Sequence, residues 1–268
     1  MKSRSVEVLA GQRVLVTGGA GFIGSHIVEQ LVEASAIVRV LDNFETGRPE
    51  NLSHVARHVE IVQGDVRRLE DCMRAVEGVS FISHQAAYCS APGSLVEPAK
   101  CIDTNVTGLT NLLVAAREAK VRRVVYASSS SVYGDGEDAA RMEPSRGLPS
   151  SPYALSKAMG EQVAELFSRT YGMTIVGLRY FNVYGPRQHG DSSYAAVIPR
   201  FFGACEGGPG PVVHGDGEQT RDFVYVGDIA AANVFAMTNP NPLPDVINVG
   251  TGRGTKVNEL ARRIARNL

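Results

Sequence analysis

Tryptophan is absent from the sequence and cysteine is rare. The 268 residues include only four cysteines, and none of them belongs to a CxxC pair or to another metal-ligand spacing. This scarcity argues against a disulfide framework and against a cysteine-based metal site. We therefore interpret the cysteines as reduced thiols of a cytoplasmic protein, and we expect no bound metal.

A charge excess of one sign and a long hydrophobic run are also missing. The 27 lysines and arginines nearly balance the 28 aspartates and glutamates, which leaves a net charge of −1. Nothing in that balance would attract nucleic acid or anionic lipid. Residues 78–96 carry no charged side chain, but they include His84, Gln85 and Pro92 and do not form a membrane span. Residues 1–10 lack the apolar segment of a signal peptide.

Short apolar runs alternate with helical patterns over the first 180 residues. The runs are continuous and rich in valine and isoleucine, which is typical of strands buried on both faces of a parallel sheet. Repeated strand–helix–strand units predict an α/β fold with a doubly wound, Rossmann-type parallel sheet. The expected strands are residues 13–17, 37–41, 59–63, 79–84, 123–128 and 174–178, and the expected helices are residues 23–34, 69–76, 100–119 and 153–171.

The character of the sequence changes after Tyr180, where glycine and proline become frequent. We expect residues 1–180 to form the Rossmann-type domain and residues 181–268 to form a smaller lobe on the carboxyl edge of its sheet. Residues 257–268 keep an apolar i, i+3, i+4, i+7 stripe up to Leu268 and have no C-cap glycine. We therefore expect this lobe to be truncated at its C-terminus.

A glycine-rich turn follows the first expected strand. Gly18, Gly21 and Gly24 have the spacing GxxGxxG and lead into the helix that begins at Ile23. The first glycine permits a tight turn, the second lets the backbone approach a pyrophosphate, and the third lets the helix pack closely on the strand. The N–H groups and the dipole at the start of the helix would then bind the phosphates. The cofactor contacts expected here are Gly18, Ala20, Gly21, Phe22, Ile23 and Gly24.

Asp42 ends the second expected strand roughly 20 residues beyond the turn, where ribose recognition is expected. Its carboxylate would accept both ribose hydroxyls and repel a 2′-phosphate, so we predict NAD as the cofactor of residues 1–180. Arg48 lies nearby and could instead hold a phosphate. Asp65 is either an adenine contact or an ordinary helix N-cap. Further expected cofactor contacts are Asn43, Asp65, Val66, Gln85, Ala86 and Ala87.

Tyr153 and Lys157 lie one turn apart on one face of an expected helix. A lysine ammonium and a positive nicotinamide ring would lower the tyrosine pKa from about 10 and make the phenolate a usable base. A YxxxK spacing by itself is common on solvated helices. The four serines 128–131 strengthen the interpretation, because they follow the fifth strand at the edge where such sheets bind ligands. Hydroxyl groups there can donate to a substrate oxygen.

Together these motifs resemble the extended short-chain dehydrogenases/reductases. Within them, the chain is most similar to the NAD-dependent nucleotide-sugar epimerases and dehydratases, and in particular to 4-epimerases of UDP-glucose or UDP-N-acetylglucosamine. The resemblance spans nearly the whole chain. Its motifs are residues 17–24 (TGGAGFIG), 128–134 (SSSSVYG), 151–157 (SPYALSK), 178–186 (LRYFNVYGP), 221–228 (RDFVYVGD) and 248–250 (NVG).

The resemblance implies a role for individual residues. Tyr153 would be the base, and Lys157 would be its partner and would also bond the nicotinamide ribose. Ser129 matches the catalytic serine or threonine of the family, and Ser130 is the close second. The resemblance also implies cofactor contacts at Asn105, Ser128, Tyr180 and Val183, and substrate contacts at Ser90, Asn182, Val197, Ile198, Arg200 and Arg221. A homodimer through helices 100–119 and 153–171 is implied as well.

The serine loop bears on the reaction. Dehydratases of the family carry Asp-Glu after the residue that matches Ser129, and its glucuronate-type decarboxylases carry a glutamate at the position of Ser131. This chain has Ser130 and Ser131 there. The resemblance therefore favours C4 epimerisation of a nucleotide sugar, with a UDP-hexose as the expected substrate. A dehydratase or reductase of the same fold is the alternative enzyme, and a non-catalytic dinucleotide-binding protein is the alternative of another class. Relatives often have an arginine after the proline of the loop that contains Ser90, whereas this chain has Gly93 at that position.

Overall fold

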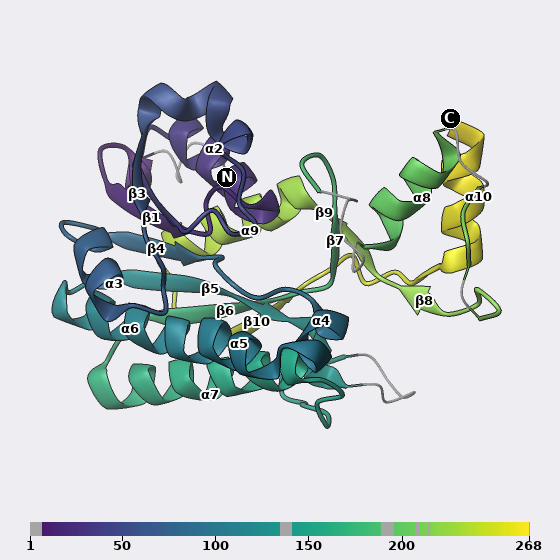
Figure 1. Ribbon diagram of the computed structural model, residues 1–268. Helices are drawn as coiled ribbons and strands as arrows, with labels where there is room; N and C mark the ends of the chain where they lie inside the picture. Colours follow the sequence, from purple (N-terminus) through teal and green to yellow (C-terminus); the bar gives the residue numbers. More distant parts are fainter. Residues whose placement is uncertain (1–6, 135–140, 189–195, 207–209, 214, 268) are drawn as a thin grey trace.

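A seven-stranded sheet forms the centre of the computed structural model, which describes residues 7–134, 141–188, 196–206, 210–213 and 215–267. Its strands are β1 (Arg13–Thr17), β2 (Ile37–Asp42), β3 (Val59–Gln63), β4 (Phe81–His84), β5 (Arg123–Ser129), β6 (Ile175–Tyr180) and β10 (Val246–Val249). The order across the sheet is β10-β6-β5-β4-β1-β2-β3, and neighbouring strands are parallel. Helices cover both faces (Figure 1), so the predicted doubly wound α/β fold is confirmed.

Two apolar cores lie on opposite faces of the sheet. Because successive side chains of a strand point to opposite faces, β1 contributes Val14 and Val16 to one core and Leu15 to the other. The first core contains side chains of α2 (Phe22–Glu33) and α9 (Val226–Thr238), and the second contains side chains of α3 (Leu69–Ala75), α6 (Gly108–Glu118) and α7 (Pro152–Tyr171). Burial on both faces explains why the strands have continuous apolar sequences.

The ends of four strands differ from the sequence prediction, and two of them, β2 and β5, are each one residue longer at the carboxyl end. β4 begins at Phe81, two residues later than expected, and β6 runs on to Tyr180. All six residues of β6 are buried, including Arg179. The longer β6 brings Arg179 and Tyr180 to the carboxyl edge of the sheet, beside the end of β5.

The expected helix 100–119 contains an irregular turn. A short helix, α5 (Pro98–Ile102), continues through a π-helical turn, Asp103–Thr107, into α6. Such turns inside α-helices are frequent at functional sites. This turn buries Asn105, a residue predicted to contact or support the site.

The chain after Tyr180 contributes to two regions. α9 and β10 belong to the layers of the central sheet, whereas α8 and α10 pack on each other to one side of it (Figure 1) through Phe201, Val257 and Ile264. The elements outside the sheet layers are β7 (Asn182–Tyr184), α8 (Val197–Cys205), β8 (Thr220–Arg221), β9 (Phe223–Tyr225), β11 (Thr255–Lys256) and α10 (Val257–Asn267). The division of the chain at residue 180 stays a prediction. Leu268, the end of the expected apolar stripe, lies outside the described residues.

Within the described part of the chain, no helix has both the length and the apolar character that crossing a membrane requires.

Replacement of Ile229 tests whether α9 is integral to the sheet unit. Ile229 is fully buried in the first core. We expect Ile229→Ala to lower the free energy of unfolding by about 2–5 kcal/mol, because it removes buried methyl groups and leaves a cavity. The matched control is Phe235→Ala on the same helix, whose side chain is 41% exposed. Urea unfolding measures both variants, and equal losses of stability would contradict the integral placement of α9.

Candidate functional site

The glycine turn after β1 is packed too closely for side chains. Gly18 has φ +65°, and a Cβ atom there would lie 2.6 Å from the backbone nitrogen of Ala86. A Cβ atom on Gly24 would lie 2.1 Å from the carbonyl oxygen of Gly18. These contacts hold the start of α2 against the ends of β1 and β4, as the glycine spacing predicts.

The N-terminus of α2 is suited to an anion. Gly21 is its N-cap, no side chain caps it, and the first turn carries no acidic residue. The first N–H groups of a helix have no partner within the helix, and the helix dipole favours negative charge beside them. Phe22, Ile23 and Gly24 provide these N–H groups, so the residues present fit a pyrophosphate.

Asp42 lies at the end of β2 and is 6% exposed. Its two carboxylate oxygens accept hydrogen bonds of 2.9 Å from the N–H groups of Ala20 and Phe44. Each oxygen has a second lone pair, so the carboxylate can still accept ribose hydroxyls. Burial raises the pKa of Asp42, and the two backbone hydrogen bonds oppose that effect.

Asp65 and Asn43 form a polar cluster next to this site. Arg67 binds the Asp65 carboxylate with two donors, Nε at 3.0 Å and Nη2 at 2.6 Å, and Asn43 donates to it at 2.9 Å. These bonds hold the pKa of Asp65 well below its usual range. The N-cap of α3 is Arg68, so the alternative interpretation of Asp65 as a helix N-cap is wrong.

Other predicted cofactor residues lie in the segments that follow β3 and β4. Val66 is buried against the second core, and its carbonyl oxygen accepts a 3.1 Å bond from Asn111. Gln85, Ala86 and Ala87 directly follow β4 and are half-buried. The N–H of Ala86 donates to the Thr17 hydroxyl at 3.3 Å, which ties this segment to the end of β1.

The serine loop lies at the carboxyl end of β5, where Ser129 pairs in register with Tyr180 of β6. The Ser129 hydroxyl accepts a 3.1 Å bond from the Ser131 N–H, and it lies close enough to the Tyr153 phenol to favour its ionised form. Ser130 follows and is half-buried. Ser128 differs from both, because its hydroxyl donates at 2.6 Å to buried Glu161. The Ser131 hydroxyl is buried, so Ser129 and Ser130 are the serines available at the edge of the sheet.

Tyr153 and Lys157 lie on the first turns of α7, with the lysine Nζ 5.8 Å from the centre of the tyrosine ring. The ammonium donates to the carbonyl oxygen of Ala127 at 2.9 Å. Burial raises the pKa of Tyr153 and lowers the pKa of Lys157. The expected low tyrosine pKa is thus not produced by the protein groups alone, because desolvation outweighs the favourable effect of the Ser129 hydroxyl on the phenolate.

Asn105 supports the loop between β4 and α4 (Ala91–Val96). Its amide accepts from the Tyr88 N–H at 2.7 Å and donates to the Tyr88 carbonyl at 3.0 Å and to the Ser156 hydroxyl at 2.8 Å. Asn105 thereby links the loop to α7 next to Tyr153. Ser90, predicted to contact the substrate, is the N-cap of α4 and accepts a 2.9 Å bond from Gly93.

A cavity of about 450 Å³ lies beside β7 and α8. It gathers predicted residues that are widely separated in the sequence, and it contains two cationic side chains, Arg200 and Arg221. Phe201 and Phe223 add aromatic surface. The predicted residues that line it are Asn182, Val183, Val197, Ile198, Arg200 and Arg221. Val183 was expected to contact the cofactor, and it lies here with the predicted substrate residues.

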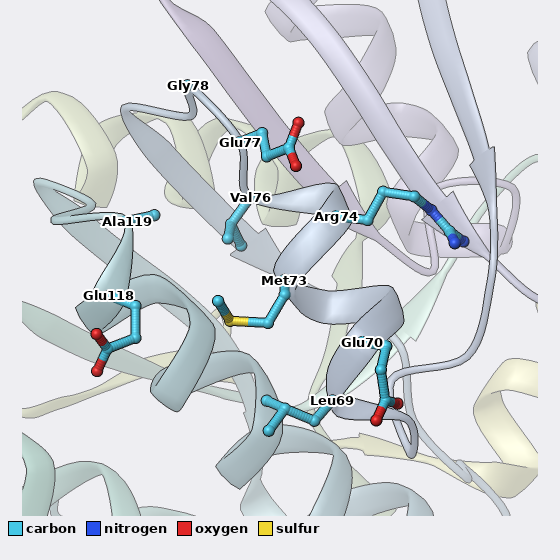
Figure 2. Close-up of a pocket in the computed structure, with 9 residues that line it drawn as sticks. All are labelled: Leu69, Glu70, Met73, Arg74, Val76, Glu77, Gly78, Glu118 and Ala119. Carbon is cyan, nitrogen blue, oxygen red and sulfur yellow. The ribbon is translucent and has the colours of Figure 1, made fainter.

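A larger cavity, of about 700 Å³, lies at the other end of the sheet. Figure 2 shows its lining, with Leu69 and Met73 of α3 facing the end of α6 and with Glu77 and Glu118 near it. This cavity contains none of the predicted site residues. Gly78 in its wall precedes β4, so it lies near the amino ends of the strands, whereas doubly wound sheets bind ligands at the carboxyl ends.

Sequence reasoning missed Asn233, which is fully buried on α9. Its Nδ2 donates to the Tyr180 hydroxyl at 2.7 Å, and its Oδ1 accepts from Gln85 at 3.1 Å and from Ser83 at 3.1 Å. Tyr180 in turn donates to Gln85 at 3.1 Å, and burial raises the pKa of Tyr180 to about 12. This network fixes the Tyr180 ring. An isolated asparagine in the apolar stretch 226–238 was the available signal.

Glu161 and Arg179 were also missed. Glu161 continues the Tyr153–Lys157 stripe at the next turn of α7, and Arg179 is a lone charged residue in an apolar strand. Both positions could have been recognised from these patterns. Among the described residues, no group of three or more His, Cys, Asp or Glu side chains could hold a metal ion.

Comparison with known proteins places this geometry in a family. Residues 14–250 match the NAD dependent epimerase/dehydratase family. A putative UDP-glucose 4-epimerase of Methanocaldococcus jannaschii is 42% identical over 249 residues, which cover 92% of this chain and 79% of the relative. A UDP-N-acetylglucosamine 4-epimerase structure from Methanobrevibacter ruminantium superposes with a TM-score of 0.90 at 39% identity and covers 94% of this chain and 81% of that one.

A UDP-glucose 4-epimerase of Thermus thermophilus, solved in complex with NAD, has a TM-score of 0.86 at 39% identity and covers 95% of this chain and 83% of that one. The predicted family and the predicted NAD cofactor are therefore confirmed. The chain belongs to the NAD-dependent epimerase/dehydratase family.

Proposed function

We propose that this chain epimerises a UDP-hexose at C4, with Tyr153 as the base. The observation that carries the proposal is the set of residue types around Tyr153 at the carboxyl edge of the sheet. The Ser129 hydroxyl lies near the phenol and favours its ionised form, and the loop 129–131 consists of serines. Glu161 lies one turn after Lys157 on the same face of α7, but its side chain is fully buried and paired with Arg179. Neither the serine loop nor this face of α7 thus offers a free acid to eliminate water, which favours epimerisation over dehydration.

The chain's own residues would perform the proton steps. The Tyr153 phenolate oxygen takes the proton of the sugar 4-hydroxyl, and the Ser129 hydroxyl donates a hydrogen bond to the same sugar oxygen. Bound NAD supplies the hydride acceptor and donor, so the sugar is oxidised at C4 and then reduced again without an external oxidant. The 4-keto sugar turns between these two steps and presents its other face.

The Tyr153 base must be ionised despite its burial. Two positive charges would oppose the desolvation in the loaded enzyme, namely the Lys157 ammonium and an oxidised nicotinamide ring. Lys157 is 8% exposed, so solvent screens its charge little. Because the base works deprotonated, we expect the turnover rate to rise with pH until the tyrosine pKa in the complex is passed.

The cavity beside β7 and α8 supports the assignment of a nucleotide diphosphate. Arg200 and Arg221 supply charge for phosphate oxygens, and Phe201, Phe223 and Val197 supply apolar surface for a base. On the cofactor side, the N-terminus of α2 would hold the pyrophosphate of NAD, and Asp42 would hold its ribose. The sugar would then lie between these two anchors, near Tyr153.

The proposal predicts conversion without added cofactor, because NAD is regenerated in each turnover. Purified protein given UDP-galactose or UDP-N-acetylglucosamine should yield the C4 epimer, measured by chromatography or by proton NMR of the anomeric region. A 4-keto-6-deoxy product would contradict epimerisation. The absence of conversion across a panel of UDP-sugars, with NAD added, would contradict the proposed function.

Removal of the Tyr153 hydroxyl tests the base. We expect Tyr153→Phe to lower kcat by about 10²–10⁴-fold, the contribution typical of general acid–base catalysis, and to leave NAD binding unchanged. Tyr171→Phe is the matched control, because Tyr171 ends the same helix and is 48% exposed. Steady-state kinetics and NAD fluorescence titration measure the two effects. Full activity of Tyr153→Phe would eliminate this residue as the base.

The proposal includes a homodimer. Leu109, Leu112, Leu113 and Ala116 of α6 are buried within the chain, so they do not provide an open face. The outward leucines of α7, Leu155 and Leu166, are 44% and 50% exposed. They support α7 as the contact helix. Figure 1 shows α7 on the outer side of the helices that cover this face of the sheet.

Charge placed on α7 should separate the subunits. We expect the unaltered protein to sediment as a dimer at micromolar concentration and Leu166→Glu to sediment as a monomer, because a buried unpaired carboxylate is costly. Ile61→Glu is the control, since Ile61 is 45% exposed on β3 at the far edge of the sheet. A monomeric unaltered protein in analytical ultracentrifugation would refute the proposed dimer.

A further inference from the structure

A buried ion pair lies directly behind the candidate site. Arg179 of β6 binds Glu161 of α7 with two donors, Nε to Oε1 at 2.8 Å and Nη2 to Oε2 at 2.8 Å. Both side chains are fully buried. Removing two charges from water is expensive, and an apolar pair of similar volume would often stabilise a fold at least as well. Stability alone is therefore a weak explanation for this pair.

Further donors converge on the same two residues. Ser128 donates its hydroxyl to Glu161 Oε1 at 2.6 Å, and Arg146 donates to Oε2 at 3.1 Å. The remaining arm of Arg179, Nη1, donates to the Tyr133 hydroxyl at 2.8 Å and to the carbonyl oxygen of Glu143 at 3.0 Å. We call Glu161, Arg179 and these partners the hub. It connects β5, β6, α7 and the segment that precedes α7.

The hub residues are neighbours of the site residues along the chain. Ser128 precedes Ser129, Arg179 precedes Tyr180, and Glu161 lies one turn beyond Lys157. Adjacent positions on rigid strands and helices move together. A displacement of Glu161 relative to Arg179 would therefore shift α7, with Tyr153 and Lys157, relative to the edge that carries Ser129 and Tyr180.

A second arm of the hub holds the segment that leads into α7. Tyr133 donates to Asn248 Oδ1 of β10 at 2.7 Å, and Asn248 Nδ2 donates to the carbonyl oxygen of Arg141 at 2.7 Å. The N–H of Asn248 donates to the Glu143 carboxylate at 3.0 Å. The segment 141–146, which precedes α7, is thus restrained by bonds to both β6 and β10.

We propose that Glu161 and Arg179 are positioning residues. They hold the α7 face that carries Tyr153 and Lys157 in place relative to the serine edge, which is Ser129 and Ser130 at the carboxyl end of β5. Only the kinetic test of this proposal depends on the proposed function. The groups that face Tyr153 are Lys157 on its own helix, Cys89 from the loop after β4, Cys101 from α5, and Ser129 from β5. Of these groups, Ser129 belongs to the edge that the hub aligns with α7, so its position relative to Tyr153 depends on the hub.

The test compares two arginine-to-lysine variants. Arg179→Lys keeps the positive charge but removes the two-donor fork and the Nη1 bonds. Arg123→Lys is the matched control. Arg123 begins β5 at the opposite edge and donates Nη1 to the carbonyl oxygens of Ala236 at 2.8 Å, Met237 at 3.3 Å and Asn239 at 2.7 Å. Both variants lose a multiple-donor arginine, but the control loses it far from the serine edge.

We expect Arg179→Lys to lower kcat by about 100-fold, because small misplacements of catalytic groups have effects of this size. KM should stay within about twofold and NAD affinity should not change, which separates positioning from substrate binding. The control should keep kcat. Equal kcat losses in the two variants, or a loss that matches the unfolded fraction measured by circular dichroism, would overturn the proposal.

A second readout does not need activity. Tyrosine labelled with ¹³C at Cζ reports the titration of Tyr153 by NMR, with Tyr153→Phe used to assign the signal. We expect Arg179→Lys to raise the pKa of Tyr153 relative to the unaltered protein, because a displaced Ser129 hydroxyl stabilises the phenolate less. An unchanged titration would refute the proposal even if the chain acts on no UDP-sugar. If Arg179→Lys does not fold, Tyr133→Phe removes two bonds of the hub, those to Arg179 and Asn248, but leaves the Glu161–Arg179 pair, and it should raise the same pKa by a smaller amount.

Discussion

The close approach of backbone at the end of β1 is the constraint on which the rest of the site depends. Gly18 packs against Ala86, and Gly24 packs against Gly18, at distances that exclude any Cβ atom. This packing brings the N-terminus of α2 to the point where the strand order reverses between β1 and β4. At that point the strand ends diverge and leave room for a ligand. The cofactor side of the site follows from this arrangement of the backbone.

The substrate side depends on side chains from later elements. The cationic and aromatic residues of the 450 Å³ cavity come from α8, β8 and β9, which lie beside the sheet and not within it. Between the two sides, Tyr153, Lys157 and Ser129 meet where α7 crosses the ends of β5 and β6. The hub of Glu161 and Arg179 lies behind this meeting point. One buried ion pair is thereby placed to hold Tyr153, Lys157 and Ser129 relative to one another.

Several assignments were within reach of sequence reasoning because they depend on local geometry. The glycine spacing, the YxxxK turn and the apolar strands each specify contacts within a few residues along the chain, and the structure has them where they were predicted. The π-helical turn at Asn105 and the extension of β6 were not predicted. Both depend on buried hydrogen bonds to distant residues, such as the bonds from Asn105 to Ser156 and from Arg179 to Glu161.

By itself, the sequence determined the doubly wound fold, the phosphate-binding turn and the family, because periodicity and short motifs record local backbone requirements. Only the tertiary structure decided which side chains are available for chemistry. It directed the Ser128 hydroxyl to Glu161, left Ser129 beside Tyr153, and raised the pKa of Tyr153 through burial. These outcomes depend on desolvation and on partners far apart in the chain, and no local pattern contains that information.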